Sequence, residues 1–239
     1  MLDRESVGKS ADASYRSNVD PIFITGGTGY IGRPLIDELL MREYNVRALV
    51  RAGSVKKLSQ GAVPIIGDAL DASTFVANIP PKATLIHLVG TPHPSPAKAA
   101  EFRRIDLASI QAATTAARQA RVQHFIYVSV AHPAPVMQAY IDVRREGEAL
   151  VRDSGISSTI LRPWYVLGPG HRWPYLLLPL YALMGRLPAT RDSAERLGLV
   201  TLKMMIDSLV CAVEAPRPSG VLIMGVREIR EASMGPSSK

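Results

Sequence analysis

Two kinds of hydrophobic pattern alternate along the first two thirds of the chain. Short apolar runs, none long enough for a helix, are typical of buried strands and occur at 22–25, 45–50, 62–66, 83–88, 124–128 and 158–161. Between them, apolar residues three or four positions apart predict amphipathic helices, most clearly over 32–42, 97–119 and 137–153. This alternation favours an α/β fold, a doubly wound parallel sheet with helices on both faces.

The pattern changes after Pro163. A turn-rich stretch leads into strongly apolar residues 173–184, which two prolines interrupt, and then into a predicted helix over 202–214 and a last strand over 220–226. Chain added after the sixth strand of an open α/β sheet usually covers the carboxyl ends of the strands, where ligands bind. We therefore expect a disordered leader (1–20), a main domain (21–163), a small substrate-side lobe whose last strand returns to the sheet (164–230) and a disordered tail (231–239).

The first strand leads directly into a glycine-rich turn. The sequence from Ile22 to Gly32 reads Ile-Phe-Ile-Thr-Gly-Gly-Thr-Gly-Tyr-Ile-Gly, and an amphipathic helix follows. Gly26 allows the sharp turn, Gly29 lets a phosphate approach the backbone, and Gly32 lets the helix lie close to the strand. The helix N-terminus directs unpaired N–H groups and the positive end of its dipole at the space above the turn. The motif predicts a diphosphate site at this corner.

Composition and charge exclude several classes of protein but do not identify the function. The chain of 239 residues is long enough for one α/β domain with an appendage. Its formal charge is +7 and its pI about 9.7, yet Lys and Arg are dispersed, so we expect no nucleic-acid partner. The single cysteine excludes an intramolecular disulfide framework, and the scattered histidines predict no metal site. The polar N-terminus lacks the apolar core of a signal peptide, which favours a cytoplasmic protein.

The glycine-rich stretch 25–32, together with Arg162-Pro163 and Gly168-Pro169-Gly170, resembles the short-chain dehydrogenase/reductase superfamily. The resemblance covers about 21–170 and is greatest to the extended and atypical branches: NmrA-like proteins, complex-I-accessory-subunit-like proteins, and relatives of the NAD-dependent epimerases and dehydratases. It implies a Rossmann fold that binds NAD(P) over 21–163. The family pattern places the cofactor against Gly26, Thr28, Gly29, Tyr30, Ile31, Gly32, Arg51, Ser54, Asp68, Ala69, Leu70, Val89, Gly90 and Pro163.

The residue that closes the second strand selects the dinucleotide. An acidic residue there hydrogen-bonds the free ribose of NAD, whereas an arginine pairs with the 2′-phosphate of NADP. Arg51 occupies this position, about 20 residues past the glycine turn, and Ser54 follows it. We therefore predict NADP(H) as the cofactor. Asp68 either accepts the adenine amine, with Leu70 against the ring, or caps the helix that follows it.

Ser129, Tyr140 and Arg144 match the family's catalytic group, with one departure. In the superfamily a Ser orients the substrate oxygen, a Tyr exchanges a proton with it, and a Lys four residues after the Tyr supports the Tyr by its charge. Here Arg144 stands in place of that Lys, and its planar fork is bulkier than an ammonium. The alternative is that Tyr140 is a packing aromatic and that Arg144 pairs with Glu148 one turn away.

Three functions remain open from the sequence. The first is an NADP(H)-dependent oxidoreductase that moves hydride between the nicotinamide and a small, rather apolar carbonyl-type substrate. The second is a non-catalytic NADP(H)-binding redox sensor or accessory subunit, and the third is a nucleotide-sugar epimerase or dehydratase. The apolar stretch Trp173–Met184 is too short to span a membrane. It is expected to line a substrate pocket, to pack within the lobe, to contact a membrane surface or to dock a partner such as a second copy of the chain.

Overall fold

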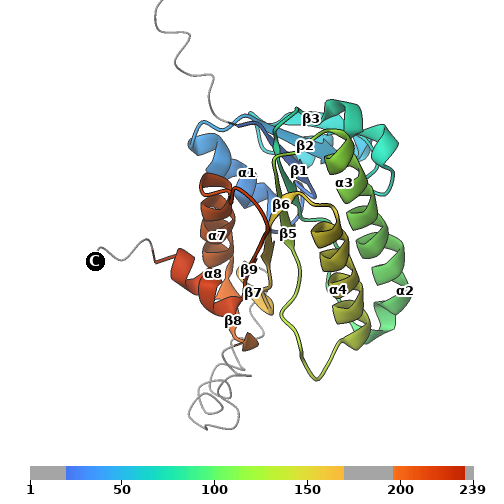
Figure 1. Cartoon of the computed structure of the whole chain (residues 1–239), viewed down its shortest axis with the longest axis vertical. Coiled ribbons are helices and arrows are strands. Elements are labelled where there is room, and N and C mark those ends of the chain that lie inside the picture. The colour runs from blue at the N-terminus through green and yellow to red at the C-terminus, as the bar shows by residue number, and fades with distance from the viewer. Residues whose placement is uncertain (1–19, 170–195, 235–239) are drawn as a thin grey trace, which may run out of the picture.

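The computed structural model describes residues 20–169 and 196–234. Its centre is a parallel sheet of seven strands, shown in Figure 1. The strands are β1 (Ile22–Thr25), β2 (Val46–Val50), β3 (Val63–Ile66), β4 (Thr84–His87), β5 (His124–Val128), β6 (Ser157–Leu161) and β9 (Val221–Met224). Their spatial order is β3-β2-β1-β4-β5-β6-β9. The order reverses between β1 and β4, which creates the crevice where doubly wound sheets bind ligands. The predicted fold class is confirmed.

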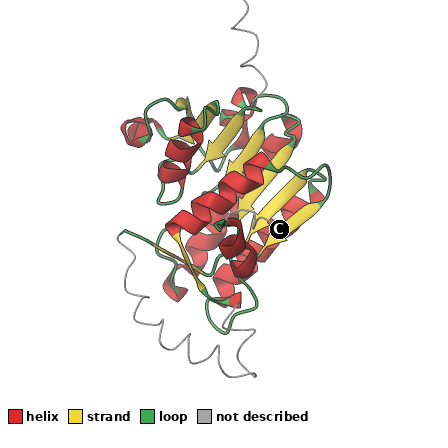
Figure 2. Ribbon diagram, turned by 90° about the vertical axis from the view of Figure 1, so that its left-hand side faces the viewer, coloured by secondary structure: helices red, strands yellow, loops and turns green. Residues whose placement is uncertain are grey.

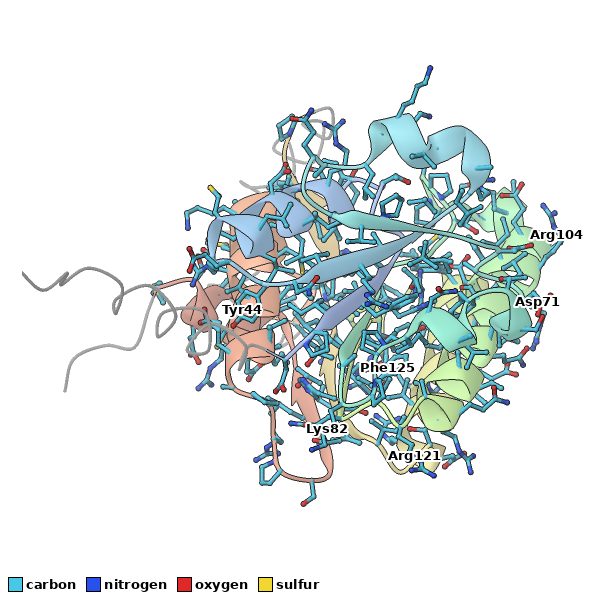
Figure 3. All side chains as sticks on the ribbon, turned by 90° about the horizontal axis from the view of Figure 1, so that it is seen from above. Tyr44, Asp71, Lys82, Arg104, Arg121 and Phe125 are labelled. Carbon is cyan, nitrogen blue, oxygen red and sulfur yellow. The ribbon has the colours of Figure 1, made fainter. Side chains whose placement is uncertain are left out.

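Helices cover both faces of this sheet (Figures 1 and 2). Helices α1 (Gly32–Met41), α7 (Leu202–Glu214) and α8 (Val226–Ala232) cover one face, and α3 (Ala108–Gln119) and α4 (Gln138–Asp153) cover the other. The alternation of side chains along each strand divides the core: Ile22 and Ile24 pack towards α1 and α7, whereas Phe23 packs towards α3. Seen from above, Phe125 lies inside the molecule, while Asp71 and Arg104 lie at its rim (Figure 3).

The segment predicted as one helix over 97–119 is divided in four. It consists of the 3₁₀ turn η4 (Pro96–Lys98), one turn of α2 (Ala99–Glu101), the π-helix η5 (Phe102–Leu107) and α3. A π-helix is rare and is often found at functional sites, because it changes which side chains face the neighbouring helix. Other short 3₁₀ segments follow β2 and β3, namely η1 (Ala52–Lys57), η2 (Ala72–Thr74) and η3 (Val76–Asn78).

The chain after β6 differs from the expectation in two places. The turn-rich stretch contains β7 (Tyr165–Leu167), which pairs in parallel with β8 (Leu199–Thr201). Helix α8 extends to Ala232, so the prediction that disorder begins at residue 231 is wrong for the first residues of that range. Glu231 lies within the helix and pairs with Arg227, one turn earlier, at 2.9 Å. Strand β9 pairs with β6 at the sheet edge. The leader over 1–19, the stretch Trp173–Met184 and the tail beyond 234 lie outside the described residues. In the described part of the chain, no helix is long and apolar enough to cross a membrane.

Candidate functional site

The glycine corner has the geometry that a diphosphate site requires. Gly26 has φ +80°, and a Cβ on it would lie 2.8 Å from the carbonyl carbon of Leu88 at the end of β4. Only glycine fits there, because the corner turns tightly against the neighbouring strand. The Gly29 amide donates to the Gly26 carbonyl at 3.0 Å and closes the turn. Gly29 is exposed, and a Cβ on it would approach only that carbonyl, at 3.2 Å, so a side chain would extend into the space in front of the turn.

The start of α1 lies against the same turn. A Cβ on Gly32 would overlap the carbonyl oxygen of Gly26 and would lie 2.7 Å from the Cα of Gly27. The glycine therefore lets the helix begin directly beside the strand. Thr28, Tyr30 and Ile31, which connect β1 to α1 in the sequence, are half-buried. The corner therefore fits a bound diphosphate, because the N-terminus of α1 begins there and, among the described residues, no side chain beyond the neighbours of Gly29 comes within 4 Å of the Cβ position of Gly29.

Arg51 lies at the carboxyl end of β2, one strand away from the corner. Its side chain is exposed and makes no ion pair with any residue of the described ranges. Its carbonyl accepts the amide of Ser54 at 2.7 Å, so the two residues share one turn. This position, beside β1 and open to solvent, is consistent with a contact to an adenosine phosphate.

The carboxyl end of β3 carries Asp68, Ala69 and Leu70. Asp68 is exposed, and its carboxylate accepts the amide of Leu70 at 2.9 Å. The alternative in which Asp68 caps the following helix is wrong, because Asp71 occupies the N-cap of η2 and accepts the amide of Ser73 at 3.0 Å. Leu70 keeps 40% of its surface exposed, which leaves an apolar side chain free for a flat ring.

A buried ion pair lies behind the loop that follows β4. The guanidinium of Arg144 donates to Asp106 at 2.6 Å, to the Val128 carbonyl at 3.1 Å and to the Tyr127 hydroxyl at 3.4 Å. The Arg144 and Asp106 side chains are only 6% and 0% exposed. Burial on its own would lower the pKa of Arg144, but the two adjacent phenols and the Asp106 carboxylate raise it, so the guanidinium stays charged.

Gly90 is small because of this ion pair. A Cβ on Gly90 would overlap the Nη2 atom of Arg144 and would lie 3.2 Å from the Asp106 carboxylate. Asp106 also accepts the amide and the hydroxyl of Thr91, at 3.0 and 2.6 Å. The sequence predicts Gly90, with the half-buried Val89, as a place where the cofactor passes β4. The contact with Arg144 is a second steric constraint that requires glycine at position 90. The contact with the cofactor stays a prediction.

The π-helix η5 and helix α4 contact each other through pairs of side chains that are four residues apart on both elements. Phe102 packs against Tyr140 with ring centroids 5.0 Å apart, and Asp106, four residues later, pairs with Arg144, four residues after Tyr140. The Arg144 guanidinium also lies 5.1 Å from the centre of the Tyr140 ring, a cation–π distance. Tyr140 is half-buried. It is thus both a packing aromatic and a direct neighbour of the cation, whereas the alternative in which Arg144 pairs with Glu148 is wrong.

Glu148 instead holds Ser129. The Ser129 hydroxyl donates to Glu148 Oε1 at 2.7 Å, and Arg162 and Arg152 donate to the same carboxylate, with the Arg162 Nε at 2.8 Å and the Arg152 Nη2 at 2.9 Å. A second Arg162 nitrogen binds Oε2. Glu148 is 1% exposed. Burial alone would raise the pKa of its carboxyl group, but hydrogen bonds from Arg162 and Ser129 lower it below its ordinary value.

Pro163 completes the carboxyl edge of the sheet. It is buried, and its carbonyl accepts the amide of Ala131 at 2.9 Å. A pocket of about 280 Å³ adjoins this edge, between the ends of β5, β6 and β9. Its lining is mixed, with the polar side chains of His132, Arg162 and Arg196 on one hand and the apolar side chains of Ala131, Ile223 and Val226 on the other.

The structure thus gathers the predicted residues in two groups. The glycine corner, Arg51 and Gly90 lie at the carboxyl ends of β1, β2 and β4, and Ser129, Tyr140 and Arg144 lie beyond the end of β5. Arg144 connects the groups because it reaches Gly90. The sequence interpretation missed Asp106 and the role of Glu148. Asp106 has no signal in the sequence, because it is 38 residues from Arg144, and Glu148 was assigned to the wrong arginine.

Comparisons with known proteins agree with this geometry. A family described as NAD(P)H-binding matches residues 26–172, more than half of the chain. Two solved structures share the fold: a short-chain dehydrogenase/reductase superfamily protein from Agrobacterium tumefaciens with bound NAD, and the enzyme WbmH from Bordetella bronchiseptica with NAD⁺. Their TM-scores are 0.63 and 0.64, each at 17% identity, and the matches cover 85% and 89% of this chain and 77% and 79% of theirs.

Curated relatives are named as reductases and as an epimerase. A 4-hydroxy-2-methyl-3-oxo-4-farnesyl-3,4-dihydroquinoline-1-oxide ketoreductase of Stigmatella aurantiaca is 30% identical over 61% of this chain and 50% of its own length. A ceramide reductase of Caulobacter vibrioides is 28% identical over 82% of this chain and 61% of its length. A UDP-glucose 4-epimerase of Vibrio cholerae is 22% identical over 85% of this chain and 69% of its own length. The chain spans only half to three fifths of the two reductases' lengths.

The sheet order, the glycine corner at its switch point and the family match define a class: this is a Rossmann-fold nucleotide-binding protein. More narrowly, the chain belongs to the family described as NAD(P)H-binding, and it shares its fold with a short-chain dehydrogenase/reductase superfamily protein.

Proposed function

We propose that this protein is an NADP(H)-dependent oxidoreductase whose substrate is a small, rather apolar carbonyl compound or the matching alcohol. The observation that carries the proposal is that the Arg144 guanidinium lies over the Tyr140 ring, bonds the Val128 carbonyl next to Ser129 and reaches Gly90 at the end of β4. The curated reductase names support the reaction type. The mixed lining of the 280 Å³ pocket, with Arg162 beside Ile223 and Val226, suits a substrate that has one polar and one apolar end.

Each residue has a distinct task in this proposal. The glycine corner binds the diphosphate, and Arg51 binds the phosphate on the adenosine. When bound, NADP(H) would provide the hydride chemistry at the substrate carbon. Tyr140 gives its phenolic proton to the substrate oxygen or receives one from it, and Arg144 stabilises the phenolate by its charge above the ring. Ser129 orients the substrate oxygen.

The cofactor preference is tested by titrating the protein with NADPH and NADH. Wild type should bind NADPH more tightly, and Arg51→Ala should remove the difference by weakening NADPH only, because a charged hydrogen bond to the phosphate is lost. Arg47→Ala is the control, since Arg47 lies on β2, the strand that Arg51 follows, and its guanidinium already donates to the Asn78 carbonyl at 3.1 Å. Equal affinities in wild type, or an unchanged preference in Arg51→Ala, would contradict the assignment.

The chemistry is tested with Tyr140→Phe, which keeps the ring that packs on Phe102 and removes only the hydroxyl. Turnover of carbonyl compounds should stop while NADPH binding is retained. Turnover at the wild-type rate would remove Tyr140 from the mechanism.

One observation favours a second candidate, a non-catalytic NADP(H)-binding protein. The charge of Arg144 is already neutralised by Asp106, so less of it acts on Tyr140 than a free cation would supply. Under this alternative NADPH binds, yet neither wild type nor Tyr140→Phe turns over any carbonyl compound.

A further inference from the structure

The hydrogen of the Ser129 hydroxyl is already in use. Ser129 is 4% exposed, and its Oγ lies 2.7 Å from Glu148 Oε1. An ionised carboxylate has no hydrogen to give, so the serine must be the donor in this bond. A hydroxyl has one hydrogen and two lone pairs, and Ser129 therefore retains only lone pairs for any other contact.

Glu148 is held so that it keeps this role. Two nitrogens of Arg162 and one nitrogen of Arg152 donate hydrogen bonds to the carboxylate, and Glu148 is 1% exposed. The two guanidinium groups stabilise the ionised form of the carboxylate, because their charge-assisted hydrogen bonds offset the cost of burying a negative charge. His132 lies further away, with its Nε2 3.4 Å from Oε1. Breaking the bond to Ser129 would leave a charge-assisted hydrogen bond unmade.

We propose that Glu148 is a positioning residue that takes the only hydrogen of Ser129, so that Ser129 meets the substrate as an acceptor and the site favours the alcohol form over the carbonyl form. An alcohol hydroxyl can donate to a serine lone pair, whereas a carbonyl oxygen has no hydrogen to donate. This inference rests on the proposed function for the identity of the substrate pair. It makes the expected role of Ser129, which is to orient the substrate oxygen, more specific: the serine accepts a hydrogen bond from that oxygen and does not donate one.

The first test compares two dead-end complexes in which no reaction can occur. The probes are 4-phenyl-2-butanol with NADPH-loaded protein and 4-phenyl-2-butanone with NADP⁺-loaded protein, both titrated calorimetrically. Ser129→Ala, which leaves the ion pairs of Glu148 in place, should weaken the alcohol complex about fivefold to tenfold and leave the ketone complex within about twofold of wild type. Weakening of the ketone complex instead, or no change in either complex, would overturn the proposal.

The second test changes the positioning residue. In Glu148→Gln the amide oxygen should face Arg162 and the amide NH₂ should donate to Ser129, which frees the serine hydrogen. The ketone complex should then tighten and the alcohol complex weaken, a reversal that loss of packing alone would not produce. Glu146→Gln is the matched control, because Glu146 lies on the same helix, is exposed and contacts Arg103 at 3.4 Å. Loss of both complexes in equal measure would contradict the proposal.

A third measurement does not depend on any substrate or on the folding of Glu148→Gln. The Ser129 hydroxyl proton should be visible by NMR in cofactor-free wild type as a slowly exchanging, downfield signal that Ser129→Ala removes. If the proton exchanges as fast as that of an exposed serine, the proposal is wrong, whatever the probes do. Failure of NADPH to bind would overturn the proposed function instead, and leaves this measurement valid.

Discussion

Replacing Asp106 by Asn tests the buried ion pair that fixes Arg144. The two charged groups are 2.6 Å apart, and their side chains are 0% and 6% exposed. Asn keeps the shape of Asp but not its charge, and its oxygen can accept from Thr91 only if its NH₂ turns towards the guanidinium. Breaking a buried pair by removing one partner costs about 3–5 kcal/mol, and we expect the free energy of unfolding to fall by that amount.

Urea unfolding near neutral pH, followed by circular dichroism, measures this loss. Asp142→Asn, an exposed residue of the same helix as Arg144, should stay within about 0.5 kcal/mol of wild type. The double variant Asp106→Leu with Arg144→Met should be more stable than Asp106→Asn alone, because it leaves no buried charge without a partner.

A loss below about 1 kcal/mol in Asp106→Asn, the size expected for an exposed pair, would refute the reasoning. It would mean that water reaches the guanidinium in solution, and that Arg144 is free to contact a ligand without Asp106. A loss of the expected size, with unchanged affinity for NADPH, would assign Asp106 a purely structural task.

Two further predictions concern Gly90 and His124. Gly90→Ala places a methyl group against the guanidinium of Arg144 and should cost about 1–3 kcal/mol in urea unfolding, whereas Gly53→Ala, which has open space around it, should not. His124 is fully buried, and burial lowers its pKa from 6.5 to about 4. As the pH falls, the unfolded chain binds a proton on this imidazole before the folded protein does. The contribution of His124 to the free energy of unfolding is therefore fully present above pH 6.5, and roughly 3 kcal/mol of it is lost as the pH falls towards 4. Thermal unfolding against pH should show a flatter profile in His124→Gln, and an unchanged profile would contradict the burial of a neutral imidazole.

The strands and the cofactor corner were predictable because their signals are local. Each of the six short apolar runs became a strand of the parallel sheet, and the spacing of Gly26, Gly29 and Gly32 reflects contacts between close neighbours in the chain. The π-helix was not predictable, because over six residues its hydrophobic periodicity is almost that of an α-helix. Only the three-dimensional structure, in which η5 packs against α4, shows the difference.

The sequence by itself determined the fold class, the glycine corner and the position of Ser129, Tyr140 and Arg144 on their elements. Hydrophobic periodicity and steric limits on glycine act over a few residues, so one chain is enough to read them. The tertiary structure alone decided the partners of these side chains. Asp106 reaches Arg144 across 38 residues of chain and Glu148 reaches Ser129 across 19, because helix α4, which carries Arg144 and Glu148, packs against both η5 and β5. Such pairings depend on packing in three dimensions, which no local pattern encodes.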